Sequence, residues 1–219
     1  MRYAILFSLL FLQLSVQCQI KGNQQIVTRH YSTENLRSLE MNLYADVTVD
    51  CTAEAKMSIT ADENLIDLIE TQIEDGHLKL TQKEWIKASQ NIVIQIGAPQ
   101  LERIEHSVHE TTWVKNINRS SFQARAIIGK LVLEGKVDQL SAGAEIGAID
   151  ANDLEAKDVR VNLWSHGKIE LAAPASINGM VKEDGQVIYQ GTQTKVKVKT
   201  KNGGLAWIIN STSIFCFQK

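Results

Sequence analysis

The sequence predicts a mainly β fold, a β-solenoid in which short strands stack in successive coils. A phrase made of a small or polar residue, a glycine and then strand-forming residues recurs as AGAEI, HGKIEL and DGQVIY, around Gly143, Gly167 and Gly185, which are spaced 24 and 18 residues apart. Short strands without a helical period, AKDVRVNL and ASINGMV, separate these phrases. Repetition of strands at roughly 20 residues is typical of a solenoid, whose coils bury their inward side chains against the coils above and below.

The rungs of this solenoid are expected over residues 101–191. Glycine reaches positive φ without steric cost, so we expect Gly143, Gly167 and Gly185 at corners of the coil. The side chains that should point inward are branched or apolar: Ile146, Ile149, Leu154, Val159, Val161, Ile169, Leu171, Ile177, Val181 and Val187.

The pattern of residues 1–18 is typical of a signal peptide. The apolar run AILFSLLFLQL follows Arg2 and is too short to cross a hydrocarbon core about 30 Å thick as a helix. Val16 and Cys18 occupy the −3 and −1 positions of a cleavage site, so the mature chain is expected to begin at Gln19. The alternatives are an uncleaved anchor or buried helix, and a lipoprotein in which Cys18 carries the lipid. Gln17 argues against the lipoprotein because a small residue is preferred there.

Composition limits the classes of function. The chain has 219 residues, 44% of them apolar, and a formal charge of −2. These values fit one or two packed domains and give no basic excess that would attract nucleic acid. The mature chain would keep two cysteines, Cys51 and Cys216, which either pair in an oxidising compartment or remain separate thiols. No CxxC or Cys/His framework occurs, so neither a metal site nor a cofactor is expected.

Residues 26–100 predict strands around a single helix that could cap one end of the solenoid. Apolar and polar side chains alternate with a period of two, as in half-buried strands, in the segments MNLYADVTV, KMSIT, HLKLT and NIVIQI. Between them, residues 62–76 have apolar side chains at helical spacing, Asp62 as a cap and Asp75-Gly76 as a stop. We therefore expect one domain over 19–219, comprising this cap, the rungs and a C-terminal strand and tail over 192–219.

The tail contains TKVKVKTK, in which lysines alternate with other residues over 194–201. Lysines on one side of a strand either form an anionic-surface or polysaccharide patch or protect an exposed sheet edge from pairing. We favour the protective role.

The order of these segments resembles the putative auto-transporter adhesin head GIN domain family of secreted Bacteroidetes proteins. The phrases that carry the resemblance are LYADVTV, ITADENLIDLIETQIEDGHLKL, IVIQIGAPQLERIEHS, IDANDLEAKDVRV, SHGKIEL and DGQVIYQG. They span nearly the whole mature chain, although each is made of strands and turns without a catalytic signature. The resemblance implies a right-handed parallel β-helix, a cell-envelope or extracellular location, and an adhesive or carbohydrate-related role.

No set of residues predicts catalysis. Asp150, Asp153, Glu155 and Asp158 are the acidic residues that a polysaccharide lyase could use to hold Ca²⁺, but no committed base lies near them in the sequence. His106 and His109 form a pair without a third ligand, so a zinc site is not expected.

Aromatic residues are the candidates for ligand binding. Trp113, Trp164 and Tyr189 lie in or beside rung strands, where flat rings could stack on sugars. The alternative is that these rings pack in the interior or at corners. Asn162 and Trp164 share the side of their strand opposite Val161 and Leu163. We therefore expect Trp164 to be the principal ligand-binding residue.

The sequence thus predicts a non-catalytic secreted or envelope protein that binds a glycan or another cell-surface component. The alternatives are an enzyme of the pectin-lyase-like type acting on polysaccharide, and a structural protein that associates with copies of itself. Convergent carboxylates beside a basic residue would indicate the enzyme, whereas aromatic and amide side chains on one face would indicate the binding protein.

Overall fold

The computed structural model describes residues 19–191, 193–210 and 213–217. The predicted signal peptide and Cys18 lie outside the described residues, which begin at Gln19. The strands of the N-terminal part are β1 (Ile20–Lys21), β2 (Ile26–Ser32), β3 (Ser38–Met41), β4 (Asp46–Asp50), β5 (Lys56–Asp62), β6 (Ile73–Glu74), β7 (His77–Leu80), β8 (Ile86–Lys87) and β9 (Val93–Gly97). They are followed by β10 (Arg103–Ala144), β11 (Ala148–Leu163), β12 (Lys168–Leu171), β13 (Ser176–Lys182), β14 (Gln186–Gln190), β15 (Lys195–Lys201), β16 (Leu205–Asn210) and β17 (Ser213–Phe217).

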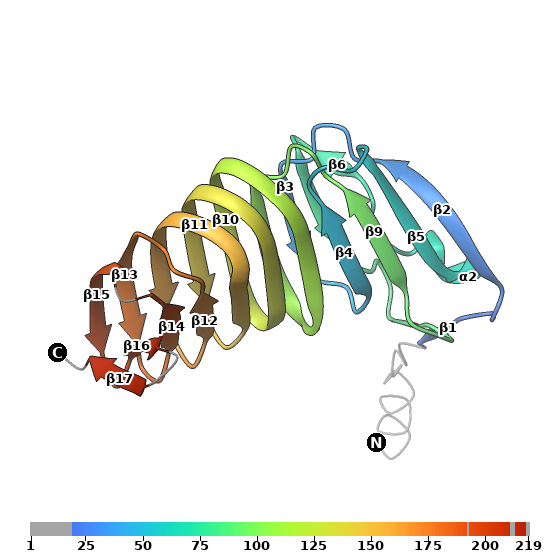
Figure 1. Ribbon diagram of the computed structural model, residues 1–219. Coiled ribbons are helices and arrows are strands. Elements are labelled where there is room, and N and C mark those ends of the chain that lie inside the picture. Colours follow the sequence, from blue (N-terminus) through green and yellow to red (C-terminus); the bar gives the residue numbers. More distant parts are fainter. Residues whose placement is uncertain (1–18, 192, 211–212, 218–219) are drawn as a thin grey trace, which may run out of the picture.

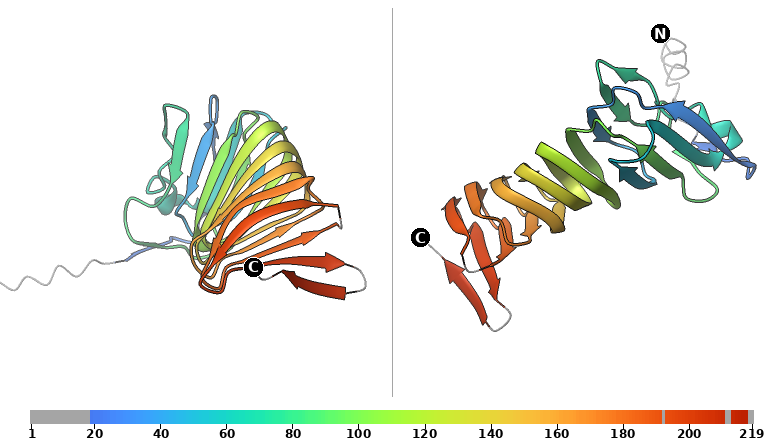
Figure 2. Two further views of the ribbon diagram at one scale, coloured as in Figure 1. Left: turned by 90° about the vertical axis from the view of Figure 1, so that its left-hand side faces the viewer. Right: turned by 45° about the horizontal axis from the view of Figure 1, so that its top comes forward.

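Strand pairing from β10 to β16 is parallel and repeats every 18 to 20 residues. Lys130 pairs with Ala148, Ala148 with Lys168, and Lys168 with Gln186. Figure 1 shows β10 and β11 winding in successive coils, and the left view of Figure 2 looks along the stack. The fold is therefore mainly β, as the sequence predicts, with the short repeat expected from the glycine-containing phrases.

The two ends of the stack are built differently from its middle. At the N-terminal end β5 pairs antiparallel with both β2 and β9, and at the C-terminal end β16 pairs antiparallel with β17. The fifteen-stranded sheet is thus mixed rather than wholly parallel. Among the described strands β15 pairs only with β13, so its lysines lie on a sheet edge, where charged side chains oppose further pairing.

The core consists of apolar side chains that stack from coil to coil. Leu131, Ile149, Ile169 and Val187 occupy one registered column and are all buried. Burial of each such side chain contributes about 1.5–3 kcal/mol relative to exposure. Nine of the ten residues predicted to point inward are buried.

The exception is Ile146, which is 63% exposed. Its backbone N–H and that of Gly147 both donate to the carbonyl of Ile127, which bends the chain into a corner between β10 and β11. The prediction for Ile146 was wrong because the alternation of side chains restarts at a corner.

The helix predicted over 62–76 is reduced to a single turn, α2 (Glu63–Ile66). Beyond it the backbone bonds to a neighbouring segment instead, since Glu70 N–H donates to Thr81 and Lys83 N–H donates to Leu68. Asp62 precedes α2 but makes no side-chain capping bond. The apolar residues at helical spacing are nevertheless removed from water, because Leu65, Ile66 and Ile69 are buried in the core.

The glycines of the repeated phrase do not have the backbone angles that we expected. None of Gly143, Gly167 and Gly185 has positive φ, and Gly143 lies within β10 rather than at a corner. Gly167 is required for another reason: a Cβ there would lie 2.7 Å from the Cβ of Ala144 in the coil below. Close approach of neighbouring coils, and not left-handed backbone, selects this glycine.

Cys51 is a buried free thiol among the described residues, and the side chain of Cys216, its candidate partner, lies outside them. Burial raises the pKa of Cys51 to about 11. In the described part of the chain, no helix has both the length and the apolar character that crossing a membrane would require.

Candidate functional site

We call the side of the stack that carries Trp164 the ladder face. It is formed by β7, β3, β10, β11, β13 and β15, which pair in parallel in that order. Figure 1 shows β10, β11, β13 and β15 in succession along the stack. Because alternate side chains point out of each strand and the strands are in register, residues 18 to 20 positions apart become neighbours on this face.

A groove of about 270 Å³ on the ladder face contains Trp164 and Asn162, two of the four predicted ligand-binding residues. Trp164 is half-buried and Asn162 is exposed. The polar and small residues that line the groove with them are Arg103, Gln123, Arg125, Ser141, Gly143 and Arg160. The structure therefore places both predicted residues in one depression and adds arginines to it.

Gly143 and Arg125 hold the ring of Trp164. A Cβ on Gly143 would lie 3.1 Å from Cη2 of Trp164, so the missing side chain makes room for the ring. The guanidinium carbon of Arg125 lies 5.1 Å from the ring centre, which is within the range of a cation–π contact. The glycine is thus part of the groove.

The groove is positively charged. Glu105 is shared by two arginines, with Oε2 3.3 Å from Nη2 of Arg103 and 3.4 Å from Nη1 of Arg125. Arg160 is exposed and forms no ion pair with any residue that the structure describes. The buried Nε of Arg125 likewise has no hydrogen-bond partner within the described ranges. One carboxylate therefore offsets three guanidinium groups.

Sequence reasoning missed the three arginines. The signal was available for Arg160, because it shares the outward parity of Asn162 and Trp164 in β11. Arg103 and Arg125 come from earlier coils, and only the register brings them to the same groove.

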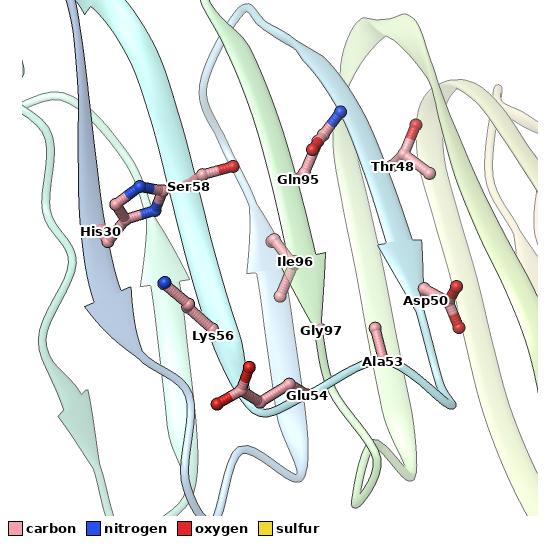
Figure 3. A pocket seen from close by; sticks show the side chains of 10 residues that line it. All are labelled: His30, Thr48, Asp50, Ala53, Glu54, Lys56, Ser58, Gln95, Ile96 and Gly97. Atoms are coloured by element: carbon pink, nitrogen blue, oxygen red, sulfur yellow. The ribbon is translucent and has the colours of Figure 1, made fainter.

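Trp113 lies elsewhere. It is 42% exposed and ends a registered row of polar side chains that crosses four other strands, made up of His30, Ser58, Gln95 and Thr48. Figure 3 shows these four side chains standing on the sheet around a shallow cavity of about 400 Å³. Trp113 does not line the groove of Trp164.

Asp50 borders the cavity in Figure 3 and is held in its ionised form. A hydrogen bond from Asn116, assisted by bonds from the backbone and hydroxyl of Thr52, lowers the pKa of this carboxyl. A carboxylate with a lowered pKa is a poor general acid or base near neutral pH.

Tyr189 is buried, with 3% of its surface exposed, and burial raises the pKa of its hydroxyl. It pairs with Leu171 and has the same parity in β14 as the core residue Val187. Tyr189 is therefore a core residue, and its prediction as a ligand-binding residue was wrong.

A third cavity, of about 470 Å³, lies near the N-terminal end and was not foreseen. Tyr44 and Trp85 line it with exposed fractions of 59% and 56%. Amide side chains surround these rings, from Gln19, Gln82, Gln90 and Asn91. The outward parity of Tyr44 in the first predicted strand was the only sequence signal for this cavity.

The acidic and histidine candidates do not converge. Asp150 lies 2.8 Å from Lys130 Nζ, Glu155 lies 3.1 Å from Lys136 Nζ, and Asp158 accepts a hydrogen bond from Ser176. His106 is fully buried, whereas His109 is exposed. Within the described residues, no three His, Cys, Asp or Glu side chains are grouped as a metal site would require.

Comparison with known proteins identifies relatives of the same fold. A putative adhesin from Bacteroides fragilis superposes with a TM-score of 0.64 and 18% identity, covering 83% of this chain and 99% of its own. A putative lipid binding protein from Parabacteroides distasonis superposes with a TM-score of 0.55 and 18% identity, covering 88% of this chain and 100% of its own. None of the curated proteins matches the chain.

The family comparison covers most of the chain. Residues 35–127 and 126–192 each match the profile of the family described as "putative auto-transporter adhesin, head GIN domain". The family and the solved relatives are described as adhesins or binding proteins and not as enzymes. This match confirms the resemblance noted in the sequence: the chain belongs to the putative auto-transporter adhesin, head GIN domain family.

Proposed function

We propose that this chain is an exported, non-catalytic adhesin head that binds a glycan through the groove at Trp164. The observation that carries the proposal is the half-buried ring of Trp164, which packs over Gly143 and lies within cation–π range of Arg125, beside the exposed amide of Asn162. We further infer that the coils form a right-handed parallel β-helix, and that the protein acts in the periplasm, at the outer-membrane surface or outside the cell.

The chemistry of the groove suits a sugar. A tryptophan ring offers apolar area for the C–H face of a pyranose, and the neighbouring amide, hydroxyl and guanidinium groups can bond its hydroxyls. Trp164 is also restrained before any ligand arrives, which lowers the entropy cost of binding. Neither an enzyme on polysaccharide nor a self-associating structural protein requires this arrangement.

A glycan array probed with the purified protein tests the proposal. We expect binding to a subset of glycans, and at least about fivefold weaker binding by Trp164→Ala, because stacking of a nucleobase on an aromatic side chain contributes about 1–3 kcal/mol and we take the same range for a sugar ring. Trp113→Ala is the matched control, since Trp113 is an exposed tryptophan outside the groove. No bound glycan, or equal losses in the two variants, would contradict the proposal.

Export and catalysis are tested separately. Mass spectrometry of the native protein should show a chain beginning at Gln19, whereas an intact Met1 or a lipid on Cys18 would exclude simple secretion. Incubation with polysaccharides and Ca²⁺ should release no unsaturated sugars. Their release, abolished by Asp150→Asn or Asp153→Asn, would favour the enzymatic alternative.

A further inference from the structure

We propose, building on the function above, that the glycan is a linear polyanion with acidic groups on alternate sugars, lying across the strands of the ladder face. Arg125, Arg160 and the pair Lys197 and Lys199 follow one another at intervals of two coils on this face, and two further cations, Arg103 and Lys182, lie on neighbouring coils.

The register defines the first row of side chains. Ser141 pairs with Arg160, Arg160 with Asn178, and Asn178 with Lys197. Towards the N-terminal end the row continues through Gln123, whose N–H donates to the carbonyl of Glu102, to Arg103. All the side chains of this row are exposed.

A second row runs beside the first. Gly143 pairs with Asn162, Asn162 with Met180, and Met180 with Lys199. Arg125 precedes Gly143 in this row, because Glu145 N–H donates to the carbonyl of Ala126 and so aligns the two coils. Trp164 covers Gly143 and closes the groove on this side.

Three cationic positions of the two rows lie two coils apart. Arg125, Arg160 and the pair Lys197 and Lys199 lie on every second coil, and strands are about 4.8 Å apart, so these charges recur at about 10 Å. Arg103 lies one coil before Arg125 and is paired with Glu105. An extended chain of pyranose rings with an acid on every second ring presents its charges at a comparable interval. A nucleic acid does not, because its charges recur at about 3.4 Å along each strand of a duplex.

Charge balance along the face points to the same ligand. On the N-terminal coils the cations have partners: Lys79 Nζ lies 2.8 Å from Glu40, and Arg103 and Arg125 share Glu105. On the later coils Arg160, Lys197 and Lys199 form no ion pair with any described residue. The acid nearest to Arg160 in the register, Asp158, accepts a hydrogen bond from Ser176 and forms no ion pair with these cations within the described residues. These unpaired cations are free to bind an anion.

The test measures binding of hyaluronan, whose acids alternate with neutral sugars, and of carboxyl-reduced hyaluronan as the neutral match. We expect wild-type protein to bind hyaluronan, to lose affinity as salt is raised, and to bind the reduced polymer at least tenfold more weakly. Arg160→Gln and Lys197→Gln should each weaken hyaluronan binding by up to about fivefold, equivalent to one solvent-exposed ion pair of up to about 1 kcal/mol. Lys136→Gln is the control, because Lys136 is an exposed cation that does not line the groove.

The outcomes separate this inference from the function on which it rests. Equal binding of both polymers, or unchanged affinity in Arg160→Gln and Lys197→Gln, would overturn the polyanion inference while leaving glycan binding intact. Competition by oligothymidylate or by phosphatidylserine vesicles as strong as that by hyaluronan would also overturn it, because the face would then be a general anion binder. Binding of no glycan, charged or neutral, would overturn the proposed function itself.

Discussion

Replacement of Gly179 by alanine should be among the most damaging single-methyl changes in this protein. Gly179 lies in β13 between Val161 and Val198, with φ of +135°. A side chain in that backbone region costs about 1–3 kcal/mol. The new Cβ would also lie 2.9 Å from the carbonyl carbon of Val161 and closer still to its oxygen, below the 3.0 Å that real Cβ atoms respect.

Strands β11 and β13 must therefore separate at this point. Loss of about two ladder hydrogen bonds, at about 0.5–1.5 kcal/mol each, brings the expected destabilisation to about 2–6 kcal/mol. For a chain of this length that corresponds to a fall in melting temperature of about 4–24 °C.

Thermal unfolding followed by far-UV circular dichroism measures this effect. Gly167→Ala is the matched control, because Gly167 lacks positive φ and a methyl group there meets only the close coil below, with an expected cost of about 1–3 kcal/mol. Asn178→Ala, at an exposed position next to Gly179, should change stability by less than about 0.5 kcal/mol. A melting temperature of Gly179→Ala equal to that of Gly167→Ala would refute the reasoning.

Three further predictions concern buried groups. The Asp62 side chain is fully buried, and burial by itself would raise the pKa of its carboxyl. Hydrogen bonds from the hydroxyl and N–H of Ser89 and from the N–H of Gln24 outweigh the effect of burial, so the pKa is lowered. The stability that Asp62 contributes is therefore present above the pKa of the unfolded state and lost as pH falls through the pKa of the folded state. The urea concentration at the unfolding midpoint should decrease when the pH is lowered below about 4, and it should depend less on pH in Asp62→Asn. Cys51, with its pKa raised to about 11, should resist thiol reagents at about pH 8 until urea unfolds the chain, and rapid labelling of the native protein would contradict its burial. Tyr189→Ala truncates a core side chain and should lower the free energy of unfolding by about 3–5 kcal/mol. A melting temperature near that of wild type would contradict the burial of Tyr189.

The strand pattern of this protein could be predicted from its sequence with good accuracy. Inward positions such as Ile149, Ile169 and Val187 follow from period-two alternation, since a buried sheet face selects apolar side chains at every second residue. The same rule identified the outward side of β11 that carries Asn162 and Trp164. Applied consistently it would have placed Tyr189 in the core, because Tyr189 lies two residues after Val187.

Local patterns were misleading where tertiary contacts compete with them. Residues 62–76 have helical spacing, yet their backbone bonds to the segment around Thr81 beyond α2, since an apolar stripe can be buried equally well in an irregular turn against the core. Ile146 fits a strand pattern but lies at a corner, where the inside and outside of the coil exchange.

The sequence by itself determined the strands, the approximate coil length and the family, because each depends on patterns within a few tens of residues. Only the tertiary structure decided the groove. Arg103, Arg125 and Arg160 come from three different coils, and a change of one residue in the register would move the outward side chains of a coil to its inside. The register depends on corner lengths that give 18 to 20 residues per coil, which the 24- and 18-residue glycine spacings do not specify. For that reason the cationic rows, and the gap at Gly143 that receives Trp164, become visible only when the coils are stacked.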